Sequence, residues 1–176
     1  LHPANTLSLH DALPIFTYRN NPQAADSVVS RIEAAGGKAA ALELDVADIG
    51  SFENFRESIL LTLQAIWGVT TLSGLVNNAG YGLFNPLESV TEAQFDGLLN
   101  VHLKGPFFLT QSLLPLMETH SSIVNLTSAT TRVATAGVAP YAAFKGGMDV
   151  LTRYMAKEFG DRRSEEHTSE LQSPIR

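Results

Sequence analysis

A tyrosine, a lysine and a serine have the types and spacing needed for acid–base chemistry. Tyr141 and Lys145 stand four residues apart just after Pro140. Proline suits the first turn of a helix, so the two side chains share one helix face. A cation about 4 Å from a phenol moves its ionisation towards neutral pH, as a proton donor and acceptor requires. Ser128 follows an apolar run, and its hydroxyl could hydrogen-bond a substrate carbonyl. An exposed pair on a helix surface would show the same Tyr–Lys spacing.

The elements that would position these side chains alternate along the chain. Short apolar runs predict strands at residues 15–18, 39–44, 72–76 and 122–126. Helices are predicted at four capped starts, namely Asn21-Pro22, Ser51-Phe52, Thr91 with Gln94 in a capping box, and Pro140. The helix after Thr91 is predicted to run unbroken to Leu113. Apolar strands that alternate with helices indicate an α/β fold, with helices on both faces of a parallel sheet.

Composition argues against several classes of function. The chain has 176 residues, 44% of them hydrophobic, which suffices for one domain with a core. Its net charge of -6 argues against nucleic acid as a partner. No apolar run reaches the roughly 18 residues of a membrane span. Because cysteine is absent, we expect neither disulfides nor a thiolate metal site, and a reducing compartment is allowed. We expect no metal ligands and a cytoplasmic protein.

Further motifs accompany the Tyr–Lys pair in a definite order. Asn77-Asn78-Ala79-Gly80 follows the third predicted strand, Ser128 follows the fourth, and Tyr141-Ala-Ala-Phe-Lys145 begins the last helix. In this order the chain resembles the short-chain dehydrogenase/reductase family over residues 17–162. The resemblance implies a Rossmann-like, doubly wound parallel sheet. It also implies hydride transfer between a nicotinamide dinucleotide and a small-molecule carbonyl or alcohol.

The resemblance assigns the catalytic roles. Tyr141 would be the acid/base, Lys145 would lower its pKa and bind the nicotinamide ribose, and Ser128 would orient the carbonyl. One position departs from the family pattern, because His102 stands where an asparagine is usual. Asn100 is a poor substitute, since two residues along a helix lie on nearly opposite faces. His102 either holds the water of a proton relay, since imidazole can donate and accept, or is a packed helix histidine.

The resemblance also places the cofactor. Asn78, Ala79 and Gly80 would let the backbone approach adenosine, and Asp45 with Val46 would contact adenine. An aspartate at the end of a strand could instead cap the following turn. Arg19 follows the first predicted strand, where an arginine can pair with a 2′-phosphate and no acidic residue is present. We therefore expect NADP rather than NAD, although a solvated arginine would show the same sequence.

Both ends of the chain resemble translated DNA-sequencing adapters. Adapter codons spell residues 6–15 and 163–173, and residues 12–15 and 163–166 correspond to opposite strands of one linker. We therefore expect 1–16 and 163–176 to be artefacts that flank a partial domain at 17–162. That domain would lack the family's first strand, its glycine-rich turn and its last strands. The loss of a central strand leaves unpaired edges, so we expect this polypeptide to be inactive and at best partly folded.

Two other functions stay open for the parent protein. An epimerase or dehydratase of the same family would use the Tyr–Lys pair with a tightly held cofactor. A non-catalytic dinucleotide-binding regulator would keep the fold without the chemistry. The resemblance further implies a homodimer or homotetramer that pairs two long helices of each subunit.

Overall fold

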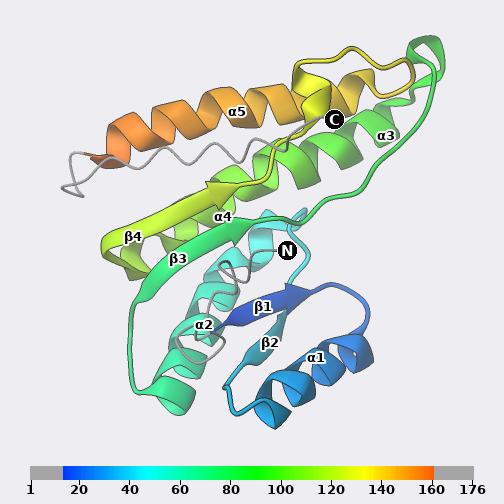
Figure 1. Cartoon of the computed structure of the whole chain (residues 1–176). Coiled ribbons are helices and arrows are strands. Elements are labelled where there is room, and N and C mark those ends of the chain that lie inside the picture. The colour runs from blue at the N-terminus through cyan, green and yellow to red at the C-terminus, as the bar shows by residue number, and fades with distance from the viewer. Residues whose placement is uncertain (1–13, 161–176) are drawn as a thin grey trace, which may run out of the picture. The chain divides into compact units, whose positions relative to one another are not determined.

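The computed structural model describes residues 14–160. They belong to two compact units that divide between Thr71 and Leu72, and each unit is described by itself (Figure 1). The adapter-like stretches lie outside the described residues, apart from residues 14–16. Among the residues described, no helix is long and apolar enough to cross a membrane.

The first unit pairs two short parallel strands with two helices. Strand β1 (Ile15–Tyr18) and strand β2 (Ala40–Glu43) run parallel, and helix α1 (Pro22–Ala34) connects them. The predicted Asn21 cap is confirmed, since its side chain accepts a hydrogen bond from the Ala24 amide at 2.9 Å. Helix α2 (Phe52–Trp67) follows, and its buried residues, spaced three or four apart along one face, are Phe52, Phe55, Ile59 and Leu63.

The start of α2 differs from the prediction. Ser51 occupies the N-cap position, but its side chain makes no capping hydrogen bond. Its hydroxyl instead donates to the Asp48 carbonyl at 2.8 Å, and the Asp48 carboxylate accepts from the Gly50 amide at 3.1 Å. The reason is the backbone of Ser51, which already has helical angles (φ -84°, ψ -12°), whereas a capping side chain needs extended ones.

The second unit carries the predicted acid–base residues. Strand β3 (Leu72–Asn77) lies parallel to strand β4 (Met117–Asn125), which begins five residues earlier than predicted. The pairing is regular from Gly74↔Ser122 to Asn77↔Asn125 and shifts register before that point. Helix α3 (Glu92–Leu99) starts at the predicted capping box, and helix α5 (Ala139–Gly160) starts one residue before Pro140.

The predicted long helix after Thr91 is not α-helical throughout. Residues Asn100–Lys104 form a π-helical turn between α3 and helix α4 (Gly105–Leu113). A π turn inserts an extra residue into a helix and often occurs at functional sites. His102, at the centre of this turn, is among the most deeply buried residues described.

Within the described residues, β1–β2 and β3–β4 form two separate two-stranded sheets. The fold class is the predicted one, with parallel strands connected by helices. Val76 of β3 is 62% exposed.

Candidate active site

Helix α5 places Tyr141 and Lys145 together, as the spacing predicts. Lys145 is only 7% exposed. Its ammonium donates a hydrogen bond to the Leu126 carbonyl at 2.6 Å, and it lies 5.9 Å from the centroid of the Tyr141 ring. Burial lowers the pKa of Lys145, because the charged form loses hydration. The pair is therefore not an exposed surface pair, since a buried cation faces a half-buried phenol.

Ser128 lies in the turn after β4, in the same unit. Its hydroxyl oxygen accepts hydrogen bonds from the Thr130 amide at 3.3 Å and from the Thr130 hydroxyl at 2.9 Å. These contacts fix the side chain at the start of the short 3₁₀ turn Ala129–Thr131. A hydroxyl has two lone pairs and one proton, so both contacts leave the Ser128 proton able to donate to a ligand.

His102 connects the loop after β3 to helix α5. Its Nε2 lies 2.7 Å from the Tyr81 carbonyl oxygen. Its ring stands edge-on to Tyr141, with the centroids 5.0 Å apart and an interplanar angle of 86°. Desolvation lowers the pKa of His102 and the nearby Lys145 charge lowers it further, while the hydrogen bond to Tyr81 raises it. His102 thus touches the predicted acid/base through its ring.

The motif Asn78-Ala79-Gly80 forms an exposed loop after β3, as a cofactor contact requires. The structure also explains why glycine is required at position 80, which the sequence alone did not. A Cβ atom at Gly80 would lie 2.7 Å from Cε1 and 3.2 Å from Nδ1 of His102. Glycine is needed there because the imidazole fills the space of a side chain.

A polar network at the ends of β3 and β4 was missed by the sequence analysis. The side chain of Asn77 donates to Asn125 at 2.8 Å and to Thr110 at 3.1 Å. Asn125 in turn donates to the hydroxyl of Thr152 on α5 at 3.0 Å. The network ties α5, and hence the Tyr–Lys pair, to the sheet. Its sequence signal was an asparagine at the end of each of two predicted neighbouring strands.

The other residues predicted to contact the cofactor, Arg19, Asp45 and Val46, belong to the first unit. One carboxylate oxygen of Asp45 accepts a hydrogen bond from the Ala47 amide at 2.9 Å, so this aspartate does cap the following turn. Neighbouring Val46 is half-buried. Arg19 is exposed, and its guanidinium donates to the Asn20 side chain at 2.9 Å. Beside it lies an open hollow of about 430 Å³, formed by β1 and the start of α1.

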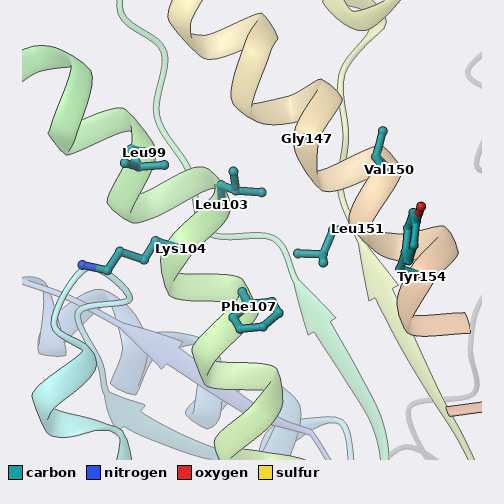
Figure 2. A pocket seen from close by; sticks show the side chains of 8 residues that line it. All are labelled: Leu99, Leu103, Lys104, Phe107, Gly147, Val150, Leu151 and Tyr154. Atoms are coloured by element: carbon teal, nitrogen blue, oxygen red, sulfur yellow. The ribbon is translucent and has the colours of Figure 1, made fainter. Parts of the chain in front are cut away.

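An apolar groove of about 380 Å³ lies between α5 and the continuous helix α3–α4 (Figure 2). A Cβ atom at Gly147 would lie 3.3 Å from Leu103, so glycine lets the two helices approach closely. Tyr154, on the wall of the groove, is 64% exposed. The groove residues are Leu99, Leu103, Lys104, Phe107, Gly147, Val150, Leu151 and Tyr154.

Comparison with known proteins agrees with this geometry. The family model described as "Enoyl-(Acyl carrier protein) reductase" matches residues 2–164. Elsinochrome reductase 1 of Elsinoe fawcettii is 31% identical over 163 residues, which cover 91% of this chain and 58% of that protein. The chain therefore belongs to this reductase family, within the short-chain dehydrogenases/reductases.

Solved structures show the same fold. The crystal structure of landomycin C-6 ketoreductase with bound NADP and rabelomycin has a TM-score of 0.82 and 32% identity, and the match covers 86% of this chain and 62% of that one. A metagenomic short-chain oxidoreductase in complex with NADP has a TM-score of 0.76 and 29% identity, over 85% of this chain and 66% of that one. The chain spans less than two thirds of the length of each of these relatives.

Proposed function

We propose that the complete protein, translated from the whole reading frame that encodes residues 17–162, is an NADP-dependent reductase of small carbonyl compounds. The observation that carries the proposal is the buried Lys145 ammonium, held by the Leu126 carbonyl at 2.6 Å and lying over the Tyr141 ring at 5.9 Å. A cation held there stabilises negative charge that develops on the phenol oxygen. The reductases named above support the direction of the reaction.

The chain's own residues would divide the proton chemistry. Tyr141 donates its phenol proton to the carbonyl oxygen of the substrate. Ser128 donates a hydrogen bond to the same oxygen and stabilises the charge that develops on it. Lys145 stabilises the phenolate that remains. The nicotinamide dinucleotide, when bound, supplies the hydride that reduces the carbonyl carbon.

The residues present fit such a cofactor. The exposed guanidinium of Arg19 borders an open hollow of about 430 Å³, and arginine binds phosphate groups with paired, charge-assisted hydrogen bonds. We propose that Arg19 holds the 2′-phosphate of NADP. Asp45 and Val46 would contact adenine, and Asn78, Ala79 and Gly80 would lie along the adenosine. Lys145 would also hold a ribose hydroxyl.

The test is the rate of NADPH oxidation by the complete protein with a panel of ketones, repeated with NADH. The Tyr141→Phe variant removes only the hydroxyl and should lower kcat by about 10²- to 10⁴-fold, the usual contribution of a general acid. NADPH should be preferred to NADH. Tyr154→Phe is the matched control, because it removes a phenol hydroxyl on the same helix away from Lys145 and keeps the ring that lines the groove.

The outcomes separate the alternatives. Equal activity of the Tyr141→Phe and wild-type proteins would overturn the proposed role of the phenol. Turnover of a substrate without a net change in NADPH would indicate the epimerase or dehydratase. Binding of NADPH without turnover of any substrate would favour the non-catalytic regulator.

We also propose that two copies of the complete protein pair through the groove between α3–α4 and α5. The groove is lined mainly by apolar side chains (Figure 2), and Val150 and Tyr154 on its wall are exposed in this chain. Burying such side chains against an identical face removes apolar surface from water.

A further inference from the structure

We propose that His102 is a positioning residue that holds the Gly80–Tyr81 backbone against the helix of the acid/base, and that its side chain does not relay protons. This inference rests on the function proposed above. Three contacts carry it, because the imidazole binds Tyr81, fills the side-chain space of Gly80 and packs on Tyr141. These contacts join the loop after β3 to α5.

The hydrogen bond to Tyr81 defines the form of the imidazole. Nε2 of His102 lies 2.7 Å from the Tyr81 carbonyl oxygen and 3.5 Å from the Tyr81 amide nitrogen. One nitrogen cannot donate to the carbonyl and accept from the amide at the same time. The contact with the carbonyl is the shorter one and therefore defines the tautomer. Nε2 carries the proton, and Nδ1 has the lone pair.

Both nitrogens are enclosed. His102 is 2% exposed, and Nδ1 is buried without a hydrogen-bond partner among the described residues. Nδ1 faces Gly80, where a Cβ atom would lie 3.2 Å away. A relay needs a nitrogen that can exchange protons with its neighbours. Here Nε2 binds a carbonyl, and Nδ1 is buried without a hydrogen-bond partner among the described residues.

Burial and a neighbouring charge both disfavour the protonated form of the ring, because they lower the pKa of His102. Lys145 is the charged group that lowers the pKa of His102, and the aromatic groups that face the ring are Tyr141 and Tyr81. An imidazolium would therefore be buried near a second cation, and no carboxylate among the described residues forms an ion pair with it. The side chain serves as a fixed donor to the loop.

The first test separates cofactor affinity from catalysis in the complete protein. His102→Leu keeps an apolar side chain of similar size but has no donor. We expect its dissociation constant for NADPH to rise about three- to tenfold, the effect of one lost hydrogen bond on a loop that lines the cofactor. His102→Asn restores an N–H donor and should recover most of the affinity. The solvent deuterium isotope effect on kcat should be unchanged in both variants.

A relay predicts the opposite pattern. His102→Leu would then lower kcat and alter the isotope effect while the affinity for NADPH stayed the same, and this result would overturn the proposal. If the protein bound no NADPH at all, the proposed function would fail instead. The two structural tests below would still show whether His102 packs against Gly80 and donates to Tyr81.

The second test is a double-mutant cycle with Gly80. Gly80→Ala should destabilise the protein, because the added methyl group meets the imidazole at 2.7 Å. The same change should cost much less in a His102→Ala background, where the space is open. The readout is the midpoint of thermal unfolding. Equal costs in both backgrounds would show that the two residues do not pack together, and would overturn the proposal.

The third test needs no variant. Nitrogen-15 spectra of histidine-labelled protein at pH 7 distinguish the two neutral tautomers and the imidazolium. We expect the Nε2–H tautomer for His102. An Nδ1–H tautomer or a charged ring would contradict the hydrogen bond to Tyr81 on which the inference depends.

Discussion

Two bases in this protein are buried next to each other, and the consequence is a dependence of stability on pH. Lys145 and His102 both have lowered pKa values because burial disfavours their charged forms. Lys145 keeps a compensating contact, since its ammonium donates to the Leu126 carbonyl. The other ring nitrogen of His102, Nδ1, has no hydrogen-bond partner among the described residues, so protonation there would leave its N–H unpaired. Acid should therefore affect the protein through His102.

We expect the free energy of unfolding of the complete protein to decrease as the pH falls through about 6.5. Below that value the unfolded chain protonates His102, whereas the folded chain resists protonation because its pKa is lowered. Stability rises with pH wherever the unfolded state binds more protons. His102→Asn should flatten this dependence by at most about 1.4 kcal/mol per pH unit, the limit for one proton.

The measurement is urea unfolding at a series of pH values between 5 and 8. His120→Asn is the matched control, because His120 is an exposed histidine at φ 68°, a left-handed conformation that asparagine tolerates. The control should keep the slope of the wild-type protein. A wild-type slope in His102→Asn would mean that His102 titrates alike in both states.

For single residues, the sequence predicted the placements that depend only on neighbouring positions in the chain. The i, i+4 spacing of Tyr141 and Lys145 places them on one helix face whatever surrounds them. The contacts of His102 depend on residues about 20 and 40 positions away in the chain, Tyr81 and Tyr141, and no local pattern encodes them. The sequence therefore left two interpretations of His102 open, and the packed one fits its burial.

The ends of the helices show the same difference between local motifs, which were predictable, and contacts that depend on the surrounding structure. Asn21 and Thr91 cap their helices as predicted, because both motifs act within four residues. Ser51 does not, because a preceding 3₁₀ turn gives it helical angles. The π turn at Asn100–Lys104 was also unpredicted. Its apolar pattern is that of a helix, and the extra residue is visible only in the backbone hydrogen bonds.

The apolar groove leads to the prediction for assembly. In the complete protein, Val150→Asp should place a charge in the groove that we propose to be covered by a second copy, and should shift the protein towards a monomer. Val133→Asp is the control, since Val133 is exposed but does not line the groove. Light scattering after gel filtration gives the mass of each variant. A Val150→Asp protein with the wild-type mass would exclude this face as the interface.

At the scale of the whole molecule, the parallel α/β class was predictable, whereas the pairing of the strands depends on more than local sequence. Alternation of apolar strands and capped helices needs only local sequence. Pairing of the strands depends on what lies between them, and among the described residues no strand joins β1–β2 to β3–β4. Val76 shows the result, because an apolar residue typical of a covered strand is 62% exposed.

This exposure leads to the last prediction, that the 176-residue chain by itself neither folds cooperatively nor reduces a carbonyl. An isolated pair of strands is marginally stable in water, and among the described residues each sheet has two strands and depends on its helices for cover. Circular dichroism during heating should show a broad transition for this chain and a sharp one for the complete protein. NADPH fluorescence should titrate to saturation only with the complete protein. A sharp transition together with saturable NADPH binding by the 176-residue chain would mean that two strand pairs and their helices suffice to hold Tyr141, Lys145 and the Gly80 loop in place.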